Sequence, residues 1–136
     1  MKEVSQQPSI TKRSDLLEPI FFEDRPDVTP EERFQNTVLR PVLKFQNASL
    51  CMIAVEAVKA LNPAFMDLHE RKQRQFLTST LTSNLALRNQ LLGMVLGMLD
   101  EPQIKEYLVL RKEYSKRIQA MLLQRIVEQY MRFLKS

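Results

Sequence analysis

The chain has 136 residues, of which 44% are hydrophobic and 26% are charged, and its formal net charge is +4. These values are typical of a single globular domain that is long enough to bury a core. The single cysteine, Cys51, excludes an intrachain disulfide framework. The residues before Ser14 lack the apolar core of a signal peptide, and no apolar run approaches the roughly 20 residues of a spanning helix. We therefore expect a cytoplasmic protein that does not enter a membrane.

The N-terminal 28 residues predict an arm that precedes the folded body. Residues 1–14 are polar and mixed in charge, and we expect them to be disordered. The stretch that follows is rich in proline, which restricts its own backbone and that of the preceding residue, so an extended conformation is expected. Phe21 and Phe22 are adjacent there, and because two exposed phenylalanines are unfavourable in water we expect them to dock in a groove.

Charge separates this arm from the rest of the chain. Between Asp15 and Glu32 seven acids oppose one base, a net charge of −6, whereas residues 33–136 hold 16 bases and 8 acids, a net charge of +8. One interpretation is that both sets face solvent, with the acids of the first helical turn favoured by the helix dipole. The other is that the arm lies across the basic body of its own or a partner subunit, in a contact that salt would weaken.

The sequence Thr29-Pro30-Glu31-Glu32 predicts the start of a helix, since it offers a threonine cap, a proline at the first helical position and a glutamate at the third. Apolar residues at three-and-four spacing extend this helix to about Leu61. Pro41 lies inside the pattern. It removes one backbone hydrogen bond, so we expect a kink, or a split at Arg40.

Asn62-Pro63 ends this first helical segment, and Asp67-Leu68-His69-Glu70 repeats the capping pattern and opens a second one. The hydroxyl-rich run Thr78–Asn84 is poor in helix formers, because short hydroxyl side chains compete for backbone groups. We therefore expect a break near Ser83 and a third helix over about Asn84–Leu99. One bent helix is the alternative.

Asp100-Glu101-Pro102-Gln103 caps the final helix, which we expect to reach about Leu134. At 1.5 Å per residue it would be a rod about 50 Å long, and residues 29–61 and 67–99 would each form one of nearly the same length. Matched lengths and short connections predict an all-α fold, an antiparallel helical bundle of three long helical segments, or four helices if the chain breaks near Ser83. The expected domains are an arm, residues 1–28, and a helical bundle, residues 29–136. The apolar seam of the final helix comprises Ile104, Tyr107, Leu108, Tyr114, Ile118, Met121, Leu122, Ile126, Tyr130 and Phe133.

The only two glycines, Gly93 and Gly97, lie four residues apart in an apolar helical run. No glycine is left for a phosphate-binding loop or a tight hairpin turn. Each glycine costs a helix interior roughly 1 kcal/mol relative to alanine, so the pair calls for a reason, and a close helix crossing supplies one. The crossing helix belongs either to the same chain or to a second copy in a homodimer.

Polar residues at Arg40, Lys44 and Asn47 interrupt the first helical segment, and Arg88 and Asn89 open the third helix. Arginine offers a planar fork of donors, so these side chains are candidates for binding a carboxylate or phosphate between helices. The alternative is that they form structural hydrogen bonds or face water.

The residues that metal and acid–base chemistry require are scarce. His69 is the only histidine and lies at a helix start, so we expect it at the surface, and we expect Cys51 in the core. We predict no catalytic residue, no metal site and no cofactor. The final helix carries eight bases against four acids, and the acids are interleaved with the bases at helical spacing. This pattern is typical of a salt-bridged face, so it does not favour nucleic-acid binding.

The run from Glu32 to Asn47, ERFQNTVLRPVLKFQN, resembles a signature of a group of short bacterial helical proteins, and Arg88-Asn89, Gly93-Met94 and Gln124-Arg125 resemble the same group. The resemblance covers about Glu31–Glu128 and implies an all-helical fold but no activity. Some members of the group are labelled glyoxalase. One histidine and no strand pattern argue against that activity, since metal-dependent glyoxalases need a mainly β scaffold with histidine and glutamate ligands, and the hydrolase class needs many histidines.

These observations favour a non-catalytic helical interaction or scaffold protein, expected to form a homodimer through the Gly93 and Gly97 stripe or the arm, with an unidentified protein as a further partner. The second hypothesis is a binder of a small molecule or anion that uses the arginine and asparagine cluster. The third is a weak nucleic-acid binder.

Overall fold

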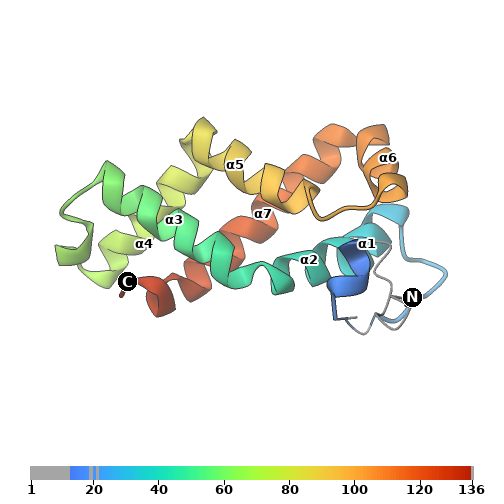
Figure 1. The fold of residues 1–136 in the computed structure, drawn as a ribbon, viewed down its shortest axis with the longest axis horizontal. Coiled ribbons are helices and arrows are strands. Elements are labelled where there is room, and N and C mark those ends of the chain that lie inside the picture. The colour runs from blue at the N-terminus through green and yellow to red at the C-terminus, as the bar shows by residue number, and fades with distance from the viewer. Residues whose placement is uncertain (1–12, 19, 21, 136) are drawn as a thin grey trace, which may run out of the picture.

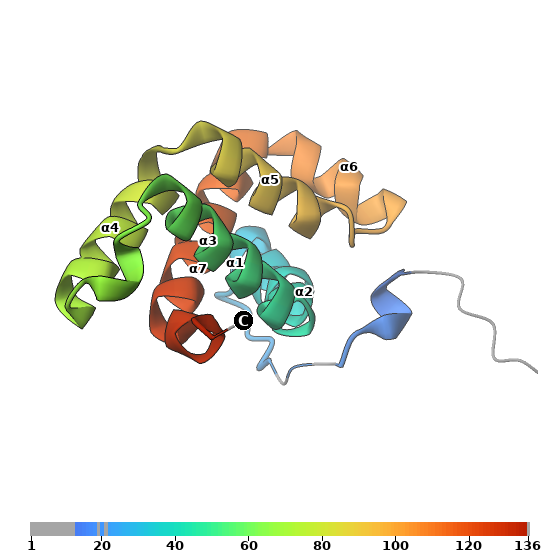
Figure 2. The ribbon, with the colours of Figure 1, turned by 60° about the vertical axis from the view of Figure 1, so that its left-hand side comes forward.

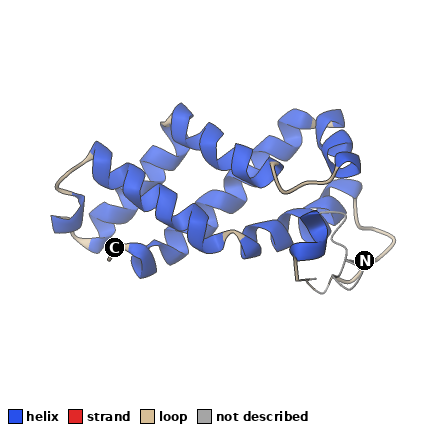
Figure 3. Ribbon diagram, viewed as in Figure 1, coloured by secondary structure: helices blue, strands red, loops and turns tan. Residues whose placement is uncertain are grey.

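The computed structural model describes residues 13–18, 20 and 22–135. In this part of the chain every regular element is helical and no strand occurs (Figure 3), which confirms the all-α class. None of the helices described is both long enough and apolar enough to cross a bilayer. The expected disorder of residues 1–14 lies outside the described residues as far as residue 12, as does the docking of Phe21, whereas Phe22 is half-buried. Arg13 and Ser14 are described, and they begin the 3-10 turn η2 (Arg13–Leu16) in place of the expected disorder.

The first helical segment begins as the sequence predicts. In α1 (Pro30–Phe34), Oγ1 of the cap Thr29 accepts from the backbone N–H of Glu32 at 3.1 Å, and Oε1 of Glu32 accepts from the backbone N–H of Thr29 at 3.2 Å. The segment continues through the π-helical turn η3 (Gln35–Leu39), α2 (Arg40–Phe45) and α3 (Asn47–Leu61). Gln46 separates α2 from α3, and its φ of −93° and ψ of 7° depart from helical values.

Pro41 does not split the helix at Arg40, but the helix before it is not an ordinary α-helix. Arg40 keeps helical angles, and its N–H donates to the carbonyl of Gln35, five residues earlier, instead of four. A proline has no N–H to donate and its ring crowds the carbonyl four residues before it, so the preceding turn widens into a π-turn. The side chains of Asn36 and Thr37 also donate to the carbonyls of Glu32 and Arg33, at 2.9 Å and 2.7 Å.

The break near Ser83 is confirmed. It separates α4 (Glu70–Ser83) from α5 (Leu85–Leu96), and Oδ1 of Asn84 accepts from the N–H of Leu87 at 2.9 Å as the cap of α5. The start of α4 differs from the prediction. Asp67 is the last residue of the short 3-10 turn η4 (Phe65–Asp67) and not the cap of α4. Leu68 follows in an extended conformation, and His69 stands directly before α4, where its side chain makes no capping hydrogen bond.

The final helix is capped at Asp100 as expected, where Oε1 of Gln103 accepts from the N–H of Asp100 at 2.8 Å. The prediction of one unbroken rod is wrong, because α6 (Glu101–Val109) ends at Leu110, whose φ of −126° and ψ of 52° are not helical. A second helix, α7 (Arg111–Gln129), follows and leads into the 3-10 turn η5 (Tyr130–Phe133). Leu108, predicted in the apolar seam, is 54% exposed at this corner.

The helices share one core, to which Phe34 of α1, Phe65 of η4, and Tyr114 of α7 contribute fully buried rings. Figure 1 shows α4 and α1 at opposite ends of the long axis, with α7 passing behind α3. After rotation, α5 and α6 lie above α1 and α2 (Figure 2). α7 contacts α3, α4, α5 and α6, and the rings of Phe34 and Tyr114 lie 4.6 Å apart, so α7 is held against the first helical segment.

Candidate functional site

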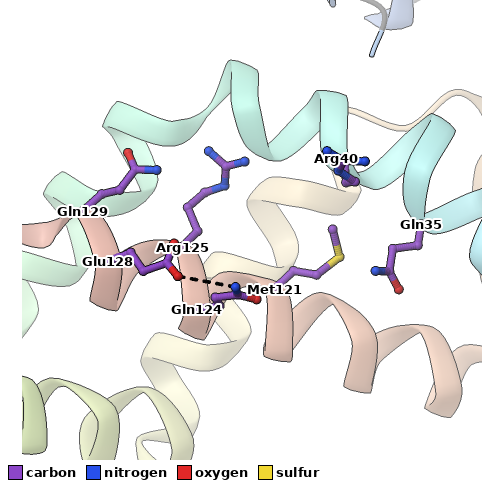
Figure 4. Close-up of a pocket in the computed structure, with 7 residues that line it drawn as sticks. All are labelled: Gln35, Arg40, Met121, Gln124, Arg125, Glu128 and Gln129. Atoms are coloured by element: carbon purple, nitrogen blue, oxygen red, sulfur yellow. Dashed lines mark hydrogen bonds between the residues drawn. The ribbon is translucent and has the colours of Figure 1, made fainter. Parts of the chain in front are cut away.

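A polar cleft of about 260 Å³ lies between the first helical segment and α7 (Figure 4). Both walls are helical, so their side chains are supported by the core behind them. The residues that line it are Gln35, Arg40, Met121, Gln124, Arg125, Glu128 and Gln129.

The first wall depends on the π-turn η3. In an α-helix the neighbours of Gln35 along one face are residues three and four positions later, and Arg40 would point elsewhere. In η3 the bond from the N–H of Arg40 to the carbonyl of Gln35 places these two residues nearly one above the other. The widened turn that Pro41 causes therefore brings Gln35 and Arg40 to the same cleft.

The second wall is one face of α7. Met121, Gln124, Arg125 and Glu128 recur at three-and-four spacing, so they project together. The adjoining face of α7 carries the buried residues Ile118, Leu122 and Ile126, which fix its rotation. Figure 4 shows Arg125 rising from α7 toward the first helical segment, Arg40 on the other wall, and the thioether of Met121 extending from α7 beneath Arg40.

Neutral amides hold the two arginines of the cleft. Nη1 of Arg40 donates to Oδ1 of Asn36 at 3.1 Å, and Nη1 of Arg125 donates to Oδ1 of Asn47 at 3.1 Å. Nδ2 of Asn47 in turn donates to Oε1 of Gln129 at 2.8 Å. Each guanidinium is thereby oriented, while most of its five N–H donors have no partner among the residues that the structure describes.

The positive charge of the cleft is only partly compensated. Within the part of the chain that the structure describes, neither Arg40 nor Arg125 forms an ion pair. Glu128 is the only acid among the lining residues, and its carboxylate accepts from Nε2 of Gln124 at 3.4 Å. Close by, Arg117 pairs with Glu113 at 2.9 Å and also donates to Oε1 of Gln35 at 2.8 Å. The cleft thus offers guanidinium and amide donors, which fit carboxylate or phosphate oxygens.

The structure divides the predicted polar cluster. Arg40 lines the cleft and Asn47 supports it, whereas Lys44 is paired with Glu18 at 3.2 Å on the surface. Arg88 and Asn89 lie on α5 and do not line the cleft, so this cleft does not bring all five predicted residues together. The carbonyl of Arg88 accepts from Gln119, which places it against another part of α7.

Sequence reasoning missed Gln35, Gln124, Arg125 and Gln129 as members of one site. The spacing of the polar residues on α7 places Gln124, Arg125 and Glu128 on one face, but interleaved acids and bases at the same spacing are also typical of a salt-bridged surface. Gln35 gave no such signal, because its position beside Arg40 depends on the widened turn before Pro41.

The glycine pair does not make a close crossing within the chain. Gly93 and Gly97 are both exposed. A Cβ added to Gly93 would have no neighbour within 4 Å, and one added to Gly97 would meet only carbonyl oxygens of Gly93 and Met94. The intrachain interpretation is therefore wrong, because α5 buries Leu87, Leu91 and Val95 and turns its glycines away from the core. Contact with a second copy stays a prediction.

The histidine and cysteine lie where the sequence predicts. His69 is exposed and Cys51 is fully buried. Burial raises the pKa of the Cys51 thiol, and the charges of Arg125 and Arg132 offset this only in part. Among the described residues no three histidine, cysteine or acidic side chains gather as metal ligands would. No protein-family model, curated protein or solved structure matches the chain.

Proposed function

We propose that this protein is a non-catalytic helical binding protein that holds a small anionic ligand in the cleft between η3, α2 and α7. The observation that carries the proposal is the pair of arginines on opposite walls, Arg40 and Arg125, each oriented by an asparagine and neither neutralised by a carboxylate in the described chain. The proposal includes an antiparallel bundle of the helical segments, which short connections favour, with the acidic arm outside it.

The amide partners of the two arginines favour binding because they lower its cost in side-chain conformational entropy. A free arginine side chain loses much rotamer freedom when it binds an anion, whereas Arg40 and Arg125 are already held by Asn36 and Asn47. Hydrogen bonds that involve a charged group contribute about 1.5–3 kcal/mol. Loss of one guanidinium should therefore weaken binding by about tenfold or more.

The size and lining of the cleft limit the ligand class. A volume of about 260 Å³ suits a small metabolite, and the Met121 thioether on α7 offers an apolar surface beside the charged groups. We propose a small carboxylate or phosphate compound, with its anionic group toward the guanidinium groups and its carbon skeleton against Met121.

The test uses citrate and inorganic phosphate as probes, titrated into the full chain at low salt and followed by calorimetry and by the shift in melting temperature. Arg125→Gln should weaken binding by about tenfold or more, because glutamine keeps a polar amide but carries no charge. Arg111→Gln is the matched control, since Arg111 is exposed and lies outside the cleft. Equal binding by the two variants, or no binding of either probe by the natural chain, contradicts the proposal.

A second proposal is a scaffold role, with a homodimer formed through the exposed face of α5. It is supported by the open space beside Gly93 and by Leu85, which is 65% exposed on the same helix. A partner helix could approach this face closely, because glycine has no side chain to hold it away. Sedimentation equilibrium tests it: a dimer that Leu85→Glu dissociates supports this role, and a monomer at every concentration contradicts it.

A further inference from the structure

The acidic arm contacts the body directly beside the cleft. The 3-10 turn η2 (Arg13–Leu16) opens the described part of the arm, and Nη1 of Arg13 donates to the carbonyl of Leu99 at 3.3 Å. Leu17 is half-buried and packs against the core. Glu18 forms its ion pair with Lys44 at 3.2 Å. A hollow of about 200 Å³ remains between the arm and the body, lined by Leu17, Glu18, Thr37, Val38, Pro41, Val42 and Gln103.

The arm and the cleft share one turn of helix. Gln35 and Arg40 of this turn line the cleft, whereas Thr37 and Pro41, between and beside them, line the hollow under the arm. Lys44 follows Arg40 by four residues in α2, so the two side chains are neighbours on one helix face, with Cβ atoms about 6 Å apart. The carboxylate of Glu18 therefore lies within the electrostatic reach of the cleft.

Glu18 carries the same kind of charge that a ligand would bring. While it is bound to Lys44 it cancels one positive charge next to the cleft and lowers the attraction for a second anion. On the basis of the proposed function, we propose that the segment Arg13–Glu18 is an anionic latch, which competes electrostatically with the ligand of the cleft. When the latch opens, Lys44 joins Arg40 as a free cation on the same helix face.

Thermodynamic linkage makes the effect reciprocal. If the closed latch weakens binding of the anion, bound anion must loosen the latch by the same factor. One unit charge at about 10 Å, in an effective dielectric of about 40–80, changes an affinity by about two- to fourfold. Added salt should reduce this difference, because the ion pair is exposed.

The experiment compares two variants of the full chain in citrate titrations at one low salt concentration. Glu18→Gln removes the latch charge, and Glu23→Gln removes the same charge from an exposed arm residue with no ion pair among the described residues. Glu18→Gln should tighten citrate binding by about two- to fourfold relative to Glu23→Gln. Hydrogen exchange of the amides of residues 15–18 in the natural chain should become faster when citrate is added.

The outcomes distinguish a failure of the latch proposal from a failure of the proposed anion-binding function, on which the latch rests. If the natural chain binds citrate and the two variants bind it equally well, the latch is overturned and the anion-binding cleft stands. If neither the natural chain nor Glu18→Gln binds citrate, both proposals fail. Slower exchange of residues 15–18 on citrate addition would also overturn the latch, because a competitor of the arm cannot stabilise it.

Discussion

Arg125 and Asn47 lie 78 residues apart in the sequence, yet Nη1 of the arginine donates to Oδ1 of the asparagine at 3.1 Å. The asparagine extends the contact with its own donor, since Nδ2 bonds Oε1 of Gln129 at 2.8 Å. An amide in this place orients the guanidinium without cancelling its charge. A carboxylate there would orient the guanidinium equally well and neutralise it. The residue at position 47 therefore controls the charge of the cleft.

Asn47→Asp should abolish citrate binding while it preserves the fold. The new carboxylate would pair with Arg125, which contributes about 0–1 kcal/mol, but it cannot donate to Oε1 of Gln129 as Nδ2 of Asn47 does. The lost hydrogen bond is worth about 0.5–1.5 kcal/mol, so the free energy of unfolding should change by no more than about 1.5 kcal/mol. Asn89→Asp is the matched control, because Asn89 is exposed and lies outside the cleft. Calorimetry and urea unfolding of both variants check the prediction. Citrate binding by Asn47→Asp at the natural affinity would be the contrary result.

Gly93→Ala should raise the free energy of unfolding by about 1 kcal/mol. Gly93 lies inside α5 with open space where a Cβ would project, so alanine gains helix propensity and meets no neighbour. Urea unfolding measures this effect. A loss of stability in a monomeric sample would show that another helix approaches this glycine. A gain in stability together with weaker self-association would place the second copy there.

Tyr130→Phe should lower the free energy of unfolding by about 2 kcal/mol. The hydroxyl of Tyr130 donates to Oε1 of Gln73 at 3.0 Å, and Nε2 of Gln73 donates to the carbonyl of Phe65 at 3.1 Å, all in a buried setting. Phenylalanine would leave the Gln73 oxygen buried without a donor. Tyr107→Phe is the comparison, expected to cost about 0.5 kcal/mol, since its partner Ser115 is only partly buried and can turn to water. Equal losses in urea unfolding would refute the reasoning.

Alkaline pH should destabilise the protein through Tyr114 and Tyr130. Burial is the main cause that raises the pKa of both hydroxyls above 10.0; Glu106 and Glu31 add to it at Tyr114, and Arg74 opposes it at Tyr130. Above about pH 10 the unfolded chain ionises these groups first, so it binds fewer protons than the folded chain and stability falls as pH rises. Below that pH their effect is absent.

Unfolding in urea at neutral pH and above about pH 10 measures this dependence. Tyr130→Phe removes one of the two groups, so its stability should fall less steeply with pH than that of the natural chain. An identical slope for the two proteins would show that Tyr130 ionises as easily in the folded state as in the unfolded one.

Local signals in the sequence predict the helix boundaries well where a cap residue is decisive. Thr29 and Asp100 begin their helices with the expected reciprocal bonds, and the hydroxyl-rich run before Asn84 ends α4. These features depend on residues within four positions of each other, which a sequence displays directly. The break at Leu110 has no glycine or proline to mark it, so the sequence predicts one long helix across this position.

The candidate site was harder to predict because it depends on long-range packing. Arg40 and Asn47 are visible as polar interruptions of an apolar helix, but their partners Arg125 and Gln129 lie about eighty residues away and become neighbours only when α7 packs against α3. Gln35 joins them through the π-turn. The exposure of Gly93 follows equally from which face of α5 meets the core, and glycine spacing alone does not specify that face.

The most direct test is to map citrate binding on the full chain by NMR, with amide and arginine side-chain signals recorded during a titration at low salt. The account predicts shifts confined to Gln35, Arg40, Arg125 and Gln129 and their immediate neighbours, with saturation at one ligand per chain. Shifts that follow the exposed bases over the whole surface without saturation, or that centre on Arg88 and Asn89 of α5, would contradict it.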